Sequence, residues 1–412
     1  MAAGLRNQLE RVATELGWAG EPDFQLERPR NPEHGALSTT LALILARRVG
    51  RPPREVAEVI LERLDLPAAG VAAAEVAGPG FINFRLQHAV LQRRLAEILA
   101  ADRAFGRSDR GAGTRIQVEF VSANPTGPLH VAHGRGAALG DAIASLLEWT
   151  GHDVTREFYV NDAGAQVERL GESIEARWLQ LQGQDVPFPE DGYHGDYVRD
   201  LAREADAEAG DQLRAMEPAQ RRAWLRDWAI ARLKEEQDRD LREFRVFFDN
   251  WFHESRLYAD GKIADTLRDL RDRGLTYERD GAEWLRTTAF GDDKDRVLVK
   301  SDGSYTYFLP DIAYHRDKAR RGFERVIDVW GADHHGYAPR MQAALASLGL
   351  PDLLEVQIVQ IVRITRGGRE VRLSKRAGEF VTLRELFEET GVDVARYFFL
   401  MRRGDAQMLF DL

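Results

Sequence analysis

One stretch of the chain, residues 116–160, restricts the possible folds more than any other. Residues 116–120 alternate between apolar and polar as in a half-buried β-strand, and a loop with two prolines and a glycine follows. A helical pattern then runs over 132–149 and ends before Gly151, and a second strand is expected over 154–160. A strand, a helix and a strand in this order build a parallel α/β sheet, whose ligands bind at the carboxyl ends of the strands.

The first part of the chain, residues 1–108, has the pattern of a separate small α+β domain. Its expected elements are helices over 5–16, 37–49, 55–64 and 90–101 and a strand over 81–86. The Gly-, Arg- and Asp-rich segment 105–113 is interpreted as a linker.

Residues 109–385 are expected to form one Rossmann-like α/β domain, and residues 386–412 the start of a C-terminal helical region. The region of about 165–260 is mostly helical and strongly charged, so we interpret it as an insertion into the sheet. The further expected elements are short strands near 284, 297 and 305, a helix, strand and helix over 310–348 with the strand at 326–330, a strand over 356–364, and helices from about 382 and 393.

Composition limits the possible classes of protein. No run of eighteen apolar residues exists, so no membrane interaction is expected. The chain has no cysteine, which excludes disulfides and Cys-built zinc sites and fits a cytoplasmic location. A net charge of −10 argues against a general polyanion binder, although a local basic groove for nucleic acid remains compatible with it.

His130 and His133 lie three residues apart where a helix is predicted to begin, so their side chains can face the same way. Helix N-termini favour anions, and two imidazoles there could hydrogen-bond phosphate oxygens in a transition state. The alternative is a pair of capping or surface histidines. No third ligand at a convincing spacing supports zinc, and no metal site is expected.

Lys375 lies in the segment Arg372-Leu373-Ser374-Lys375, which is followed by Gly378. Only six of the 57 basic residues are lysines, so a lysine in a glycine-flanked loop is notable in this chain. Its ammonium suits a loop that closes over phosphates, and the alternative is an exposed turn. Neither a dinucleotide fingerprint nor a P-loop pattern is present.

Two further groups of polar residues stand where α/β proteins bind ligands. Pro310 suits the first turn of a helix, which puts Asp311 near the helix start, either as a helix-initiating acid or as a carboxylate aimed into a pocket. Asp333, His334 and His335 follow the strand over 326–330 at its carboxyl end, where chance loop polarity is the alternative.

In combination these motifs resemble the class I aminoacyl-tRNA synthetases, and within that class the arginyl-tRNA synthetases. His130-Val131-Ala132-His133 is similar to the "HIGH" signature and Arg372-Leu373-Ser374-Lys375 to the "KMSK" loop. The other similar segments are the entry strand 118–125, the turn 161–166, and 31–35 and 78–84 in an additional N-terminal domain. The resemblance covers essentially the whole chain.

The resemblance implies a fold, a reaction and partners. The fold would be a Rossmann-like class I core with a helical insertion, preceded by a small tRNA-contacting α+β domain. ATP, as its Mg²⁺ complex, and L-arginine would form arginyl-adenylate, and the arginine would pass to tRNA(Arg). No tightly bound cofactor is expected, and a monomer is expected.

The resemblance also assigns roles to residues of this chain. His130, His133 and Lys375 would stabilise charge on the α-phosphate, and Ser374 and Arg372 would shape the closing loop. The expected amino-acid pocket comprises Glu119, Ser122, Asn124, Tyr307 and Asp311. The residues expected near the nucleotide or the arginine are Gly134, Asp333, His334 and His335.

Two departures from the family pattern keep other functions open. Ala132 stands where the family has a glycine that lets adenine lie close to the backbone, so ATP binding could be weaker. Family members also continue beyond residue 412 into a helical anticodon-binding domain, which we expect this chain to lack. These departures favour one alternative, a noncatalytic relative that binds tRNA or arginine. A second alternative is a small-molecule nucleotidylyltransferase, which shares a His-x-x-His phosphate site.

Overall fold

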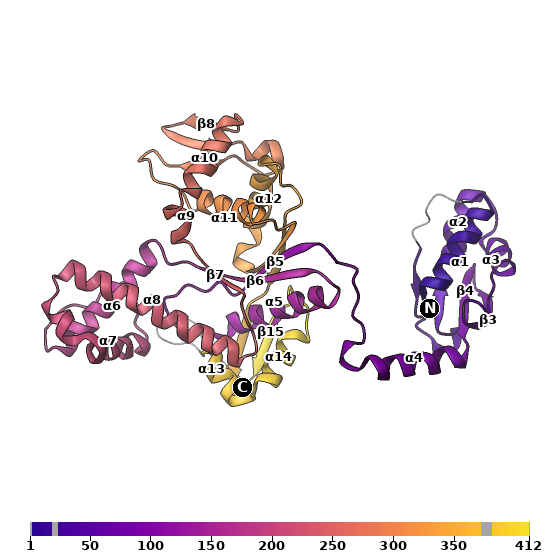
Figure 1. Ribbon diagram of the computed structural model, residues 1–412, viewed down its shortest axis with the longest axis horizontal. Helices are drawn as coiled ribbons and strands as arrows, with labels where there is room; N and C mark the ends of the chain where they lie inside the picture. Colours follow the sequence, from indigo (N-terminus) through magenta and orange to yellow (C-terminus); the bar gives the residue numbers. More distant parts are fainter. Residues whose placement is uncertain (1, 19–23, 372–380, 412) are drawn as a thin grey trace. The chain divides into compact units, whose positions relative to one another are not determined.

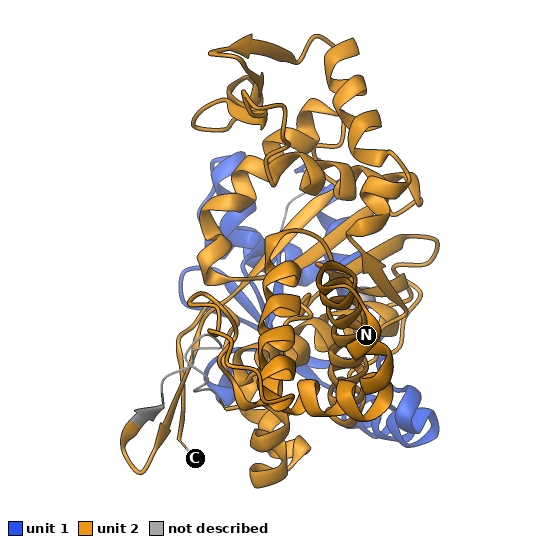
Figure 2. Cartoon of the chain, turned by 90° about the vertical axis from the view of Figure 1, so that its left-hand side faces the viewer, with its two compact units in different colours: residues 1–106 blue, residues 107–412 orange. Residues whose placement is uncertain are grey.

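A computed structural model describes residues 2–18, 24–371 and 381–411 of the chain. The chain divides into two compact units, residues 1–106 and 107–412, which Figure 2 shows in blue and orange. No helix among the described residues is both long and apolar enough to cross a bilayer.

Unit 1 combines a four-stranded antiparallel sheet, of strand order β1-β2-β4-β3, with helices that share one apolar core. Leu9, Leu45, Ile60 and Phe84 are fully buried in this core. The elements are α1 (Ala2–Glu15), β1 (Leu26–Glu27), the 3-10 helix η1 (Pro32–His34), β2 (Leu37–Thr39), α2 (Leu41–Val49), α3 (Pro53–Glu62), β3 (Val71–Ala77), β4 (Phe81–Leu86), α4 (His88–Ala101) and η2 (Asp102–Ala104).

The helix predicted over 37–49 was wrong at its start. Residues Leu37–Thr39 form β2 and pair with β4, with Leu37 opposite Phe84. The apolar periodicity of the segment is real, but the backbone of its first three residues pairs with a strand more than 40 residues away.

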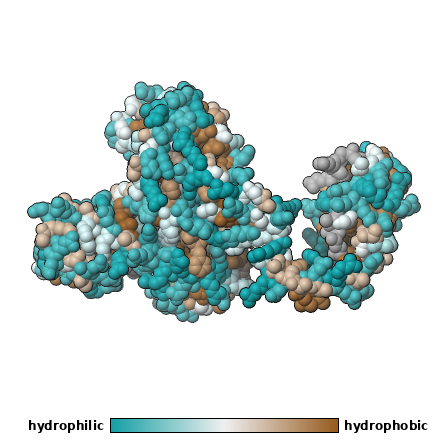
Figure 3. Space-filling view, viewed as in Figure 1, coloured by the Kyte–Doolittle hydropathy of each residue, from teal (hydrophilic) through white to brown (hydrophobic). Residues whose placement is uncertain are grey.

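Helix α4 contributes no buried residue to unit 1. Leu91, Leu95 and Leu99 are exposed, and Figure 3 shows the apolar surface that gathers on this helix.

Unit 2 is built on a parallel sheet of strand order β12-β11-β5-β6-β7, in which every neighbouring pair is parallel (Figure 1). The predicted α/β fold with a preceding small α+β unit is therefore confirmed. The elements of the first half of unit 2, up to β7, are β5 (Arg115–Glu119), α5 (Val131–Trp149), β6 (Asp153–Val160), α6 (Ala165–Leu181), α7 (Asp196–Ala215), α8 (Pro218–Glu243) and β7 (Asn250–His253). Helices α6 to α8 follow β6 and precede β7 in the chain. They pack around a separate apolar core of their own.

The second half of unit 2 returns to the other side of β5. Its elements are α9 (Ser255–Ala259), α10 (Lys262–Asp272), β8 (Thr276–Arg279), β9 (Ala282–Leu285), η3 (Thr287–Phe290), β10 (Arg296–Val299), α11 (Phe308–Arg320), β11 (Arg325–Gly331), η4 (Ala332–Tyr337), α12 (Ala338–Ser347), β12 (Leu354–Val359), β13 (Val362–Arg366), β14 (Arg369–Val371), α13 (Leu383–Thr390), α14 (Val392–Leu400) and β15 (Met408–Asp411). Strands β8 to β10 form a small antiparallel sheet. Strands β13 to β15 form a small mixed sheet, in which β13 pairs antiparallel with β14 and parallel with β15.

The single strand predicted over 356–364 was wrong. The segment contains the end of β12, in the parallel sheet, and the start of β13, which pairs with β14 and β15. The backbone N–H of Gln360, between the two strands, donates to the carbonyl of Gly404 at 2.9 Å. The chain changes sheets at this residue because its partner comes from a distant segment.

Candidate active site

Two cavities adjoin at the carboxyl ends of β5 and β11. The chain runs from β5 to β6 on one side and later returns to β11 on the other, so this is the switch point at which open α/β sheets bind ligands. The first cavity has a volume of about 400 Å³ and the second of about 230 Å³. Both are lined by Val121, Ser122, Val329, Trp330, Gly331 and His334.

The turn after β5 forms the wall that the two cavities share. Val121 and Ser122 have φ angles of 68° and 39°, a left-handed conformation that is costly for a β-branched residue. The Ser122 hydroxyl donates to Glu119 Oε1 at 3.0 Å and accepts from the backbone N–H of Tyr159 at 3.1 Å. These hydrogen bonds hold the strained turn in place at the site.

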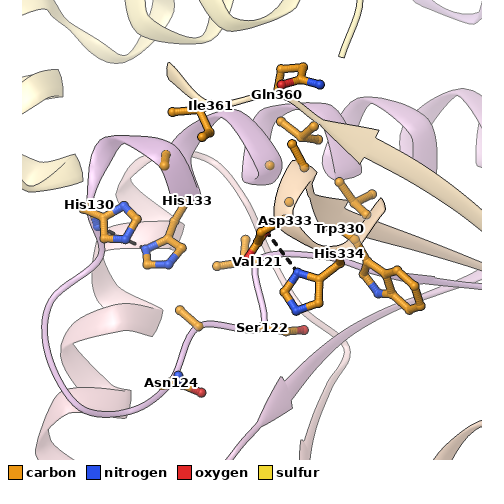
Figure 4. A pocket seen from close by; sticks show the side chains of 17 residues that line it. Val121, Ser122, Asn124, His130, His133, Trp330, Asp333, His334, Gln360 and Ile361 are labelled. Atoms are coloured by element: carbon orange, nitrogen blue, oxygen red, sulfur yellow. Dashed lines mark hydrogen bonds and ion pairs between the residues drawn. The ribbon is translucent and has the colours of Figure 1, made fainter. Parts of the chain in front are cut away.

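His130 and His133 lie together at the start of α5 and line the first cavity (Figure 4). Their rings stack, with centroids 3.7 Å apart and an interplanar angle of 21°. The backbone N–H of His130 donates to Nδ1 of His133 at 3.2 Å, which leaves Nε2 of His133 as the protonated nitrogen of a neutral ring. The pair can thus offer imidazole donors to an anion at a helix N-terminus.

The residues just after the predicted phosphate-binding loop are fixed beside this histidine pair. The backbone N–H of Val131 donates to the carbonyl of Val381 at 3.2 Å, and that of Leu383 donates to the carbonyl of Leu129 at 2.8 Å. On the other side of the loop, Val371 ends β14 and pairs with Ile364 of β13. The predicted residues Arg372, Ser374 and Lys375 themselves lie outside the described residues.

Three other predicted residues line the first cavity. Asn124 donates through Nδ2 to Gln166 Oε1 at 2.7 Å, and Nδ1 of His334 lies 3.1 Å from Asp333 Oδ1 (Figure 4). Ala132, which replaces the family glycine, also lines this cavity.

The structure does not bring Gly134 or His335 to the first cavity. Gly134 is buried, and a Cβ atom there would lie 2.6 Å from Leu383 Cδ1, so this glycine allows α13 to pack closely against α5. Gly136, two residues further along α5, lines the cavity instead. His335 lines a separate open hollow beside Arg403.

Carboxylates dominate the second cavity. Glu119, Asp311 and Asp328 all line it, together with the tyrosines 159, 314 and 337. Burial raises the pKa of Asp311, an effect that the hydrogen bond from Tyr337 opposes. A small cavity with several carboxylates suits a ligand that carries positive charge.

The hydroxyl partner of Asp311 is Tyr337, which donates to Asp311 Oδ2. The structure does not bring the predicted Tyr307 into the cavity, because its side chain is 83% exposed at the start of α11. The next two residues, Phe308 and Leu309, occupy the buried positions at this helix end. Of the two residues of this helix expected in the amino-acid pocket, the structure places Asp311 in the cavity and Tyr307 outside it.

Several residues of the second cavity were not predicted from the sequence. Tyr314 and His315 follow Asp311 by three and four positions, so a helix starting near Pro310 places them on the same face. That spacing is a signal that could have found them. Asp328 and Tyr337 carry no such local signal, because their neighbours come from distant segments.

This fold and site define a class I tRNA synthetase. The family model described as "tRNA synthetases class I (R), catalytic domain" matches residues 94–399. A second model, "Arginyl tRNA synthetase N terminal domain", matches residues 3–86.

Relatives narrow the class to one family. The chain is 51% identical over 412 residues to the arginine–tRNA ligase of Geobacillus kaustophilus, a match that covers 99% of this chain and 74% of that protein. It is 52% identical to the arginine–tRNA ligase of Geobacillus thermodenitrificans, over 99% of this chain and 75% of the relative. The chain belongs to the arginyl-tRNA synthetase family.

A solved structure agrees on the fold. Arginyl-tRNA synthetase of Thermus thermophilus superposes with a TM-score of 0.74 at 22% identity, over 100% of this chain and 77% of that one. The likeness covers the architecture of both units.

Proposed function

We propose that this chain is an arginine–tRNA ligase, which activates L-arginine with ATP and transfers it to tRNA(Arg). Family membership over 99% of the chain supports this activity. The observation that carries the proposal is the pair of adjoining cavities, one with imidazoles and one with carboxylates, which share the wall at Ser122, Trp330 and His334.

The nucleotide would bind in the first cavity as its magnesium complex. His130 and His133 would hydrogen-bond the α-phosphate while the arginine carboxylate attacks it and pyrophosphate leaves. Lys375 would follow the departing phosphates, with Ser374 and Arg372 shaping its loop.

Arginine would bind in the second cavity. A guanidinium is a planar fork of donors that a carboxylate matches with two parallel hydrogen bonds, and Asp311 oriented by Tyr337 suits that role. A neutral analogue would leave this carboxylate unpaired, and such polar mismatches discriminate by roughly 10⁴-fold, so no editing site is required. Glu119 and Ser122 line the same cavity, and Asn124 would approach the amino acid from the adjoining first cavity.

We further propose that the enzyme is a cytoplasmic monomer with arginine, ATP and tRNA(Arg) as its partners. Light scattering of the purified chain at several concentrations tests the oligomeric state.

Arginine-dependent ATP–pyrophosphate exchange, measured with and without tRNA(Arg), tests the activity. We expect exchange in the presence of the tRNA, since members of this family usually need it to activate arginine. Lys375→Ala should lower the exchange rate by several orders of magnitude while arginine binding, measured by calorimetry, survives. No exchange under either condition would refute the proposed function, and near-normal exchange by Lys375→Ala would remove that lysine from the mechanism.

A further inference from the structure

A fully buried lysine, Lys318 of α11, lies directly beneath the carboxylate-lined cavity. Its side chain is 0% exposed, and its Nζ lies 2.6 Å from Glu119 Oε2 and 2.9 Å from Asp328 Oδ1. A buried ammonium is strongly unfavourable unless it is paired and hydrogen-bonded. In this chain it is paired with two carboxylates that both line the cavity.

The sheet register explains why a cation is needed there. Glu119 on β5 and Asp328 on β11 are direct partners in the parallel ladder, so two like charges face each other on neighbouring strands. Lys318 bridges them from the helix that follows Asp311. Without the ammonium, the two carboxylates would repel each other in a site from which water is largely excluded.

The charge of Lys318 matters more for the ionised form of Glu119 than for that of Asp328. Asp328 has a second basic partner, since His315 Nε2 lies 2.9 Å from Asp328 Oδ2. The other ring nitrogen of His315 lies 2.8 Å from the carbonyl oxygen of Asp311, and two acceptors suit an imidazolium with two N–H donors. Glu119 instead has the neutral hydroxyls of Ser122 and Tyr314 as its other partners.

The Tyr314 hydroxyl cannot replace the lysine. It lies 2.8 Å from Glu119 Oε2 and 2.6 Å from Glu157 Oε1, and its single proton can serve only one of these carboxylates. Glu157 has its own cation, because Arg321 donates to both of its oxygens at 2.5 and 2.8 Å. Lys318 is thus the cation in direct contact with Glu119 in the described part of the site.

We propose that Lys318 is a positioning residue for amino-acid binding, whose buried ammonium keeps the Glu119 carboxylate ionised and oriented so that it can accept a cationic group of arginine in the cavity. This inference rests on the proposed function, and it adds a residue that does not itself line either cavity. Burial raises the pKa of Glu119, and the charge of Lys318 is the largest influence that opposes this rise. Removing the charge should therefore raise the pKa of Glu119 further and favour its protonated form, which cannot pair with a cation.

Lys318→Met keeps the length and apolar stem of the side chain and removes its charge. We expect the KM for arginine in the exchange reaction to rise at least tenfold at pH 7, while the KM for ATP and kcat change less than threefold. The KM ratio of variant to parent should shrink as pH rises, because rising pH favours the ionised form of Glu119. Lys318→Arg should stay within about threefold of the parent protein.

The pH profile must be interpreted against every ionisable or charged group that faces this pair. These groups are Asp311, Tyr314, His315 and Arg321 from α11 and its C-terminal end, Asp328 from β11, and Glu157 and Tyr159 from β6. They are present in both proteins, so the ratio of KM values isolates the effect of the lysine.

Lys262→Met is the matched control, because it makes the same change in a lysine that pairs with Asp317 and is partly exposed. We expect it to leave the KM for arginine unchanged. A tenfold rise in this control, or a KM ratio for Lys318→Met that is constant with pH, would indicate a structural effect and overturn the proposal.

A double-mutant cycle with Glu119→Gln covers the case in which Lys318→Met fails to fold. The pair Lys318→Met/Glu119→Gln removes one charge of each sign, and its KM for arginine should lie within threefold of Glu119→Gln alone. A further tenfold rise would show that Lys318 does not act through Glu119. If the parent protein lacks exchange activity, the proposed function fails by itself, and arginine binding by calorimetry still tests the lysine.

Discussion

At the scale of single residues, Asp311 is the most direct test of the arginine pocket. Removing one partner of a buried charge pair usually costs about 2–5 kcal/mol, which corresponds to roughly 30-fold or more in affinity. Asp311→Asn should therefore raise the KM for arginine by at least about 30-fold, and Tyr337→Phe should raise it by less. Steady-state exchange kinetics measure both.

Tyr307→Phe is the matched control for Tyr337→Phe, since it removes the same hydroxyl from a side chain that is 83% exposed. We expect a change of less than twofold in the KM for arginine. A large rise in this KM would show that the Tyr307 hydroxyl contributes to arginine binding and would contradict the geometry of α11.

The raised pKa of Glu254 predicts that arginine binding depends on pH. Burial, followed by the charge of Asp311, raises the pKa of Glu254 to about 7. A cation bound at Asp311 favours the ionised form of Glu254, so affinity should increase as pH rises through 7. We expect the KM for arginine to fall by up to about tenfold between pH 6 and 8, if the coupling amounts to one pKa unit.

Glu254→Gln should flatten this profile. The effect of rising pH on stability is opposite to its effect on arginine affinity. A carboxyl group whose pKa is raised in the folded state lowers the free energy of unfolding as it ionises. At pH 8 the variant should accordingly unfold at the same temperature as the parent protein or a higher one. An unchanged KM profile in the variant would assign the pH dependence to another group.

At the scale of elements, helix α5 can pack against Phe120 because residue 140 is a glycine. A Cβ atom at Gly140 would lie 2.2 Å from Cγ of Phe120, a ring that is 1% exposed just beyond the end of β5. Overpacking of this kind typically costs about 1–3 kcal/mol, so Gly140→Ala should lower the free energy of unfolding by that amount. Urea denaturation followed by circular dichroism measures the change.

Gly136 of the same helix provides the control, because no atom lies within 4 Å of the position of an added Cβ. Gly136→Ala should leave stability unchanged or raise it by up to about 1 kcal/mol, through helix propensity alone. The opposite order of the two variants would mean that α5 does not pack on Phe120 as described.

The elements also show what the sequence could and could not predict. The unit from β5 through α5 to β6 was recognisable because its signals are local: alternation, a proline-rich loop, helical periodicity and a glycine stop. The boundaries at β2 and β12 depend on pairing with strands that lie far away in the chain. The site follows the same rule. The helix-start patterns indicated His130 and Asp311 from neighbouring residues, whereas Lys318 and Tyr337 reach the site through tertiary contacts.

At the scale of the whole molecule, each of the two units has its own apolar core. Leu9 is fully buried in the core of unit 1, and Leu241 is fully buried in that of unit 2. Truncating a buried leucine to alanine costs about 2–5 kcal/mol, much of it through the cavity that remains. Leu9→Ala and Leu241→Ala should therefore be similarly destabilising, each within its own unit.

Native-state hydrogen exchange followed by mass spectrometry distinguishes the two units. Leu9→Ala should speed exchange in α1 to β4 and leave β5 and β6 protected, while Leu241→Ala should do the reverse. The reason is that a core substitution lowers the opening free energy of the cooperative unit to which it belongs and not that of another. Loss of protection in both units from either substitution would show that residues 1–412 unfold as one cooperative block, and the division at Gly106 would then have no thermodynamic counterpart.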